Sequence, residues 1–150
     1  MRTVSKSLKT PAWLPALLLL AACEGDGLLP PSGSVVGTWG TRDAGFIVSD
    51  TSAHVHIGCT YGDVHQAITL DAQGRFDVPG LYNIKAFPID LGVFHPARFI
   101  GAVDGSRLVL TIVLTDTTAS FGPVTLIYGR EPTMAVCPIC RVPGAMGRRR

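Results

Sequence analysis

Apolar and polar residues alternate with a period of two over much of the chain between Val35 and Cys137. The clearest example is the segment 106–114, in which every second residue from Leu108 onward is leucine or isoleucine. This pattern is typical of a strand that buries one face, because successive side chains of a strand point to opposite sides. We therefore expect one apolar set to face the core: Leu108, Leu110, Ile112 and Leu114.

The rest of this region also fits short strands separated by turns. Residues 97–103 precede the leucine-rich segment, and Asp104-Gly105 between the two predicts a two-residue type I′ hairpin turn. Turns are also predicted at 61–63 and 71–74, a bulge or bend at Pro79-Gly80, and a long loop at 88–96. Runs rich in β-branched and aromatic residues predict the other strands: 35–40, 46–48, 53–59, 66–70, 75–78, 81–87, 124–128 and 134–137.

These short, closely spaced strands show no helical periodicity. The predicted fold class is therefore all-β, an antiparallel meander of about eight strands. The meander would close into a small barrel or fold into a β-sandwich. Closure is favoured because it removes exposed strand edges.

The first 22 residues have a different pattern. Residues 1–9 contain Arg2, Lys6 and Lys9 and no acidic residue, and residues 12–22 are largely apolar. That apolar run is too short to cross a hydrocarbon layer of ~30 Å, which needs about 20 apolar residues. A positive flank, a short apolar core and small residues at its end indicate a secretory signal.

Leu20-Ala21-Ala22-Cys23 resembles the lipobox of bacterial lipoproteins. The resemblance implies cleavage before Cys23, a diacylglyceryl thioether on its sulfur and acylation of the new amino group, with palmitate among the chains. Two or three chains give lasting membrane attachment, since each buried methylene contributes about 0.8 kcal/mol and one chain binds only marginally. The expected location is the bacterial envelope, with Glu24 favouring the outer over the inner membrane. The alternatives are an ordinary signal peptide with a cysteine near the cut, and an uncleaved signal anchor.

Cleavage would divide the chain into four parts. They are a signal peptide (1–22), a tether rich in Gly and Pro (23–34), one β-domain (35–137) and a basic tail (138–150). Loss of the signal leaves ten basic and 11 acidic residues and a net charge of −1. Three of those basic residues are the terminal arginines, so no basic surface is implied for the domain and nucleic acid is not an expected partner.

Three further cysteines follow Cys23, namely Cys59, Cys137 and Cys140. In an oxidising envelope two of them would pair. Cys59 and Cys137 both lie at predicted strand ends, and their bridge would close a loop of about 79 residues, worth up to ~4.5 kcal/mol in the chain-entropy model. Cys140 would then be free. Alternatively, Cys137-Pro138-Ile139-Cys140 has the C-x-x-C spacing of redox sites and of half a zinc site.

Two histidines, His54 and His56, lie two residues apart on a predicted strand and therefore on one face of it. Such a pair binds a metal when a third ligand is near, and His65 or Asp63 would be that ligand. The alternative is a polar, solvent-facing side of the strand. No catalytic motif occurs, although folding could bring the carboxylates of Asp43, Asp77 and Asp90 together.

Gly37-Thr38-Trp39 at the head of a meander is similar to the G-x-W start of lipocalins. In that family the tryptophan closes the barrel floor beneath an arginine that follows the last strand. The resemblance implies this role for Trp39 and Arg130. The 94 residues from Gly37 to Arg130 are few for a lipocalin with a roomy cavity, and Thr115-Asp116 lacks the tyrosine of that family's middle motif.

Several phrases resemble a group of uncharacterised small bacterial secreted and lipoprotein β-domains. They are Val-Val-Gly-Thr-Trp-Gly, Leu-Asp-Ala-Gln-Gly-Arg-Phe-Asp, Val-Asp-Gly, and a Gly-Arg shortly before a cysteine. The function expected is a non-enzymatic envelope module that binds a small apolar ligand or another envelope component, without a cofactor. The alternatives are a metal-dependent enzyme using His54 and His56, and a purely structural or interaction lipoprotein.

Overall fold

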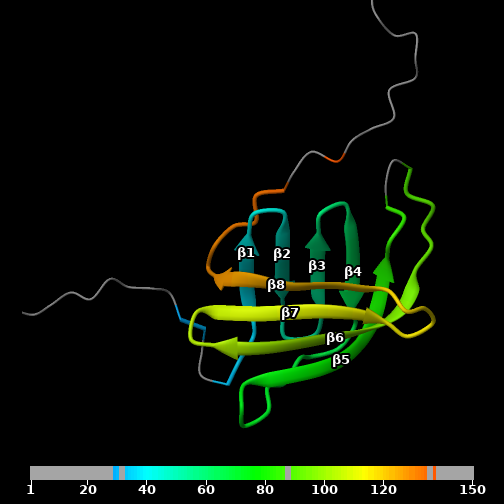
Figure 1. The fold of residues 1–150 in the computed structure, drawn as a ribbon. Coiled ribbons are helices and arrows are strands. Elements are labelled where there is room, and N and C mark those ends of the chain that lie inside the picture. Colours follow the sequence, from blue (N-terminus) through cyan, green and yellow to red (C-terminus); the bar gives the residue numbers. More distant parts are fainter. Residues whose placement is uncertain (1–28, 31–32, 87–88, 135–136, 138–150) are drawn as a thin grey trace, which may run out of the picture.

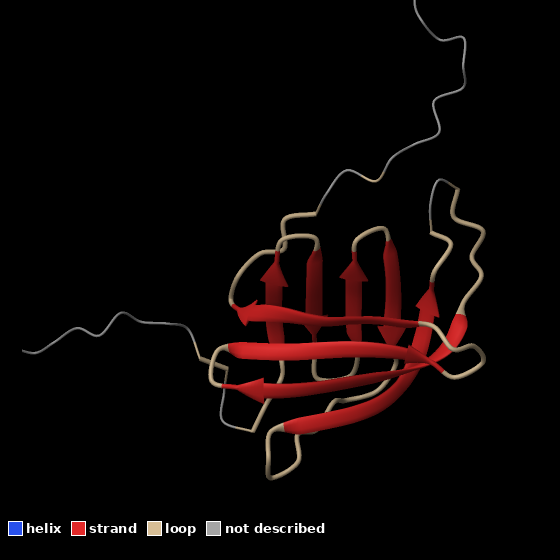
Figure 2. Ribbon diagram, in the orientation of Figure 1, coloured by secondary structure: helices blue, strands red, loops and turns tan. Residues whose placement is uncertain are grey.

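The chain folds into a closed antiparallel barrel of eight strands (Figures 1 and 2). The computed structural model describes residues 29–30, 33–86, 89–134 and 137. Each strand pairs with the next along the chain, and the last pairs with the first, so the predicted fold class is confirmed in its barrel form. The strands are β1 (Gly37–Thr41), β2 (Ala44–Val48), β3 (Ala53–Ile57), β4 (Thr60–Val64), β5 (Arg75–Asn83), β6 (His95–Asp104), β7 (Arg107–Leu114) and β8 (Ser120–Tyr128).

The barrel has two halves whose strands cross. In Figure 1 the short strands β1–β4 run roughly across the longer β6–β8, and β5 curves from one half to the other. The predicted bend at Pro79-Gly80 lies within this continuous strand. A Cβ on Gly80 would lie 2.5 Å from the Asp63 carbonyl oxygen and 2.6 Å from the Phe99 ring. A glycine is therefore required where β5 passes close to both neighbours.

Side chains fill the inside of the barrel. The predicted leucine face is confirmed, since Leu108, Leu110 and Ile112 are fully buried and Leu114 is 2% exposed. Aromatic rings meet across the interior, with the ring centroids of Tyr82 and Phe121 4.9 Å apart. An eight-stranded barrel is just wide enough either for side chains to fill it or for one small ligand. Here buried side chains form one hydrophobic core inside the barrel. The largest fully buried residues are Trp39, Tyr82, Phe46 and Phe99.

Trp39 is buried where β1 meets β8. Its indole Nε1 donates a hydrogen bond of 2.7 Å to the Val35 carbonyl oxygen, and the Tyr128 ring lies edge-on at a centroid distance of 5.0 Å. Arg130 is exposed. The described residue whose ring packs against the indole is Tyr128. The burial predicted for Trp39 is thus observed, whereas the contact with the Arg130 guanidinium is not among those the structure shows.

The chain turns back earlier than predicted after β3. Residues 61–63, expected to form a turn, lie within β4, and 66–70, expected to form a strand, contribute only an isolated bridge from Thr69 to Ser34. The turn is made instead by Gly58 and Cys59. Gly58 has a φ of +58°, which glycine adopts without steric cost, and this allows the tight reversal.

The ends of two other predicted elements also differ. Asp104 pairs with Arg107, so the β6–β7 turn consists of Gly105 and Ser106. Only Gly105 has a positive φ, of +56°, whereas a type I′ turn needs two; glycine at the first central position is typical of type II′. The strand predicted at 134–137 is not formed by its described residues, because Met134 and Cys137 lie outside any strand.

Candidate functional site

A disulfide joins Cys59 to Cys137, with the two Cα atoms 5.7 Å apart. This confirms the predicted pairing, and it takes up one of the two thiols that the C-x-x-C interpretation needs. We call residues 129–134 together with Cys137 the C-terminal strap. The strap lies on the first two strands: Thr133 N donates to the Thr41 carbonyl, and Asp43 N donates to the Thr133 carbonyl.

Two glycines make room for the strap. Gly40 and Gly45 face each other across β1 and β2. A Cβ on Gly40 would lie 2.2 Å from the Arg130 carbonyl oxygen, and one on Gly45 would lie 2.7 Å from the Pro132 ring. Neither clash could be relieved without moving the strap, since its backbone and a rigid ring are the atoms involved. These glycines therefore allow the C-terminal strap to cover the outer face of β1 and β2.

His54 and His56 stand together on the outer face of β3, as predicted. Their ring centroids are 4.8 Å apart, and the Tyr61 ring on β4 lies 5.9 Å from His54 and 5.5 Å from His56. The Nδ1 of His54 is 2.6 Å from Oδ1 of Asp63, its direct partner across β3 and β4. Burial lowers the pKa of His56, the neighbouring His54 lowers it further, and Asp63 acts in the opposite direction. We call His54, His56, Tyr61 and Asp63 the histidine cluster.

The loop between β5 and β6 is fastened to the histidine cluster through Asp90. Its carboxylate accepts hydrogen bonds from the Tyr61 hydroxyl at 2.6 Å, Asn83 Nδ2 at 2.7 Å and Gly92 N at 2.8 Å. The bond between Tyr61 and Asp90 raises the pKa of the phenol and lowers the pKa of the carboxyl. Phe94 completes the contact, with its ring edge-on to Tyr61 at 5.6 Å. The role of Tyr61 was not predictable from the local pattern, because Tyr61-Gly62-Asp63 has the composition of a turn.

The predicted third metal ligands lie close to His54. Both Asp63 and His65 line the same small hollow as His54, of about 250 Å³. Within the described residues, however, no three His, Cys, Asp or Glu side chains form a group able to hold a metal ion. A second His–Asp pair lies elsewhere on the barrel, where His95 Nδ1 is 2.8 Å from Asp116 Oδ2.

The three aspartates named as candidate catalytic carboxylates lie in three different elements, namely β5, the β5–β6 loop and the β1–β2 turn. Asp77 pairs with Arg98 at 2.8 Å on the outer face of β5 and β6. Asp90 binds Tyr61, as described above. Asp43 lies in the β1–β2 turn with a φ of +62°. The structure therefore does not gather these carboxylates: one forms a surface ion pair, one fastens a loop and one lies in a turn.

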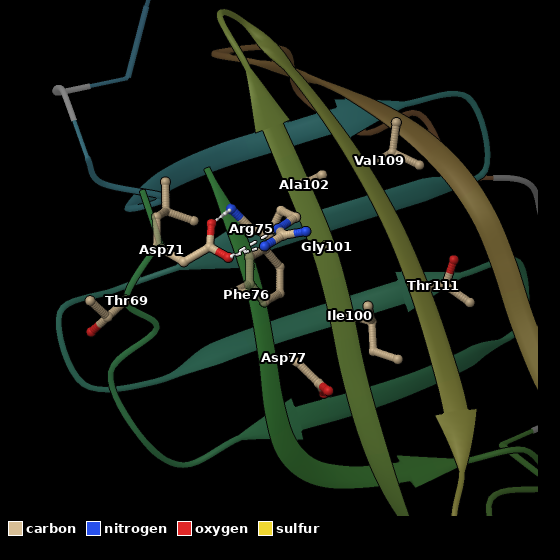
Figure 3. A pocket seen from close by; sticks show the side chains of 11 residues that line it. Thr69, Asp71, Arg75, Phe76, Asp77, Ile100, Gly101, Ala102, Val109 and Thr111 are labelled. Carbon is tan, nitrogen blue, oxygen red and sulfur yellow. Dashed lines mark hydrogen bonds and ion pairs between the residues drawn. The ribbon is translucent and has the colours of Figure 1, made fainter. Parts of the chain in front are cut away.

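An open apolar groove of about 720 Å³ lies on the outer face of β5–β7 (Figure 3). Ile100 pairs directly with Thr111, and Ala102 with Val109, so these four side chains form a continuous floor on one face. Ile100 and Val109 are 40% and 39% exposed, so the floor is open to solvent. Leu70 and Thr69, from the segment before β5, complete the lining at one side.

The charged residues beside this groove are paired. Arg75 Nη2 lies 2.9 Å from Asp71 Oδ2, and Arg98 Nε lies 2.8 Å from Asp77 Oδ1. In Figure 3 the Asp71–Arg75 pair lies at one side of the exposed apolar side chains. The groove thus combines an apolar floor with a rim whose two carboxylates are both neutralised.

A smaller hollow of about 370 Å³ adjoins the groove and shares Leu70 and Asp71 with it. It is lined on its other side by Leu29 and Pro30, which precede the barrel. The point at which the chain enters the domain is therefore beside the groove. Neither hollow was predicted from the sequence, although the outward position of Val109, opposite the leucine face, was a signal for an apolar outer surface.

The predicted lipidation site, Cys23, lies outside the described residues, as does Cys140. The described part of the chain contains no helix that is long and apolar enough to cross a membrane. Comparison of the chain with protein-family models, with curated proteins and with solved structures finds no match.

Proposed function

We propose that this protein is a lipid-anchored envelope module that binds a small apolar ligand in the outer groove of β5–β7. The observation that carries the proposal is the exposed apolar floor formed by Ile100, Ala102 and Val109. The volume of about 720 Å³ is within the range of roughly 300–1,000 Å³ that small-molecule sites occupy. The barrel interior is packed with side chains, so the binding site differs from the enclosed cavity of a lipocalin.

The charges at the rim define the class of ligand. Asp71 and Asp77 are each within 3 Å of an arginine. Neither carboxylate therefore needs a cationic ligand, and neither arginine needs an anionic one. Exposed pairs of this kind contribute about 0–1 kcal/mol to stability, so their main effect is to leave the groove without a strong field. An uncharged hydrocarbon such as an acyl chain fits this surface best.

The entry of the chain supports a ligand from the lipid phase. Leu29 borders the hollow next to the groove. It lies six residues after Cys23, a stretch that spans at most about 20 Å when fully extended. If Cys23 carries the anchor, the groove is held close to the bilayer surface, where acyl chains are available.

The test is a binding assay with a fluorescent fatty-acid analogue, displaced by unlabelled palmitate. We expect saturable binding to the wild-type domain and at least tenfold weaker binding to Ile100→Asp, because a charge on the floor would lose hydration when the ligand covers it. Ile47→Asp is the matched control. Ile47 is 51% exposed on the outer face of β2, outside the groove, and its replacement should leave the affinity unchanged.

Near-ultraviolet circular dichroism would confirm that both variants are folded. Binding that does not saturate, or that falls equally in the two variants, would contradict the proposed site. Saturable binding that survives Ile100→Asp would show that the ligand occupies another surface.

A further inference from the structure

We propose that His54 and His56 together bind one divalent transition-metal ion on the outer face of β3, with water completing its coordination. The order of affinity for nitrogen ligands among the first-row ions makes Cu²⁺ the tightest-binding ion. This inference is independent of the groove, because the histidine cluster and the groove have no residue in common.

The first observation is the way in which Asp63 holds His54. The distance of 2.6 Å between Nδ1 and Oδ1 makes Nδ1–H the donor and the carboxylate the acceptor. The lone pair of the neutral imidazole is then on Nε2. A carboxylate bound to the far nitrogen in this manner fixes the tautomer and the ring orientation of metal-ligating histidines and raises their basicity. His54 is 41% exposed at its side chain, so a metal can approach it from solvent.

The second observation is the spacing of the two rings. A Zn–N bond of about 2.0–2.1 Å puts the ring centre roughly 3.2 Å from the ion, so two imidazoles at a tetrahedral or square angle have centroids on the order of 4.5–5.2 Å apart. The centroids of His54 and His56 are 4.8 Å apart. The two rings are therefore at a centroid separation compatible with a shared ion, with their planes at 67° to each other.

The third observation concerns the surroundings of the two rings. Tyr61 lies beside both imidazoles, and it is held there by its hydrogen bond to Asp90 and by the edge of Phe94. These contacts limit the positions open to His54 and His56 and so reduce the entropy lost on chelation. Because the described residues offer no group of three ligands, the ion would keep water ligands and exchange readily.

The experiment titrates Cu²⁺ alone into the purified full-length chain in a non-ionic detergent, with free thiols alkylated first. Calorimetry gives the affinity and stoichiometry, and electron paramagnetic resonance counts the coordinating imidazoles. We expect one Cu²⁺ per chain with two imidazoles. The affinity should fall at least tenfold in His54→Gln and in His56→Gln. It should fall about tenfold in Asp63→Asn, as is usual when the partner of a ligating histidine is lost.

His95→Gln is the matched control. His95 also bonds an aspartate through Nδ1, at 2.8 Å, but it is a single imidazole, so its replacement should leave the affinity unchanged. Circular dichroism in the far ultraviolet would show that each variant retains its strands. A bound ion with one imidazole, an affinity unaffected by His56→Gln, or an equal loss in His95→Gln would overturn the proposal.

Discussion

Trp39 is the residue on which the contact between the first and last strands depends. Its ring is fully buried, its nitrogen donates to Val35, and Tyr128 packs against its edge. We expect Trp39→Ala to lower the free energy of unfolding by about 3–5 kcal/mol, as aromatic truncations in cores do. Trp39→Phe keeps most of the apolar contact but loses the hydrogen bond, so its cost should be smaller. Urea denaturation followed by circular dichroism measures both.

Ile47→Ala provides the comparison, because Ile47 is 51% exposed and its truncation should change stability by less than about 0.5 kcal/mol. Equal denaturation midpoints for Trp39→Ala and Ile47→Ala would show that the ring is not part of the core.

The sequence indicated where Trp39 lies but not what it touches. Its burial was implied by the resemblance of Gly37-Thr38-Trp39 to the G-x-W start of lipocalins. The partner depends on the register between β1 and β8, in which Trp39 lies opposite Tyr128, some ninety positions further along the chain. Local pattern contains no information on that register. His54 and His56 are the opposite case, since the period of two alone places both on one face.

At the scale of elements, glycine explains the main error in the predicted strands. Tyr61-Gly62-Asp63 has the composition of a turn, yet Gly62 lies in β4. Glycine is needed there because a Cβ would lie 2.4 Å from both the Leu81 carbonyl oxygen and the Tyr82 ring. Gly58, in contrast, serves a turn through its positive φ. A sequence does not distinguish a glycine needed for a backbone angle from one needed for close packing. The leucine face of β7 was predictable because its alternation is long and unbroken.

The C-terminal strap is held by backbone hydrogen bonds and by the disulfide, which joins residues 78 positions apart. We expect the double variant Cys59→Ala/Cys137→Ala to be less stable by up to ~4.5 kcal/mol, because the unfolded chain regains the freedom of a long loop. Thermal unfolding gives the difference. Hydrogen exchange at the Thr133 amide, which bonds to Thr41, should become faster than at amides of β6 and β7.

Cys140→Ala is the control for this experiment and should unfold at the wild-type temperature. If the double variant and Cys140→Ala unfold at the same temperature, the bridge does not stabilise the domain. If all three proteins exchange the Thr133 amide at one rate, the strap is held by its hydrogen bonds alone.

At the scale of the whole molecule, the sequence predicts a barrel but only part of its candidate sites. Short strands and the small size of the domain favour closure, and large inward side chains then leave the interior packed. The groove is formed by three strands together with the segment that precedes β5, so its lining is assembled from positions such as Leu70, Ile100 and Val109. Alternation predicts that Val109 points outward. It does not predict that Thr69 and Leu70, from the segment before β5, line the same groove and make the outer face concave.

The proposed anchor at Cys23 would hold this groove close to the bilayer surface. Cys23→Ala removes the sulfur to which the diacylglyceryl group would be attached, and the lipoprotein pathway cleaves only after that attachment. We therefore expect the variant to lose label from a radioactive fatty acid, to migrate as the longer, uncleaved chain and to leave the membrane fraction more readily, since its short apolar segment is a poor membrane span. Cys140→Ala keeps the lipobox and should be labelled like the wild type. Equal labelling of Cys23→Ala and wild type would contradict lipid attachment at Cys23. The groove next to Leu29 would then not be held near the acyl chains of a bilayer.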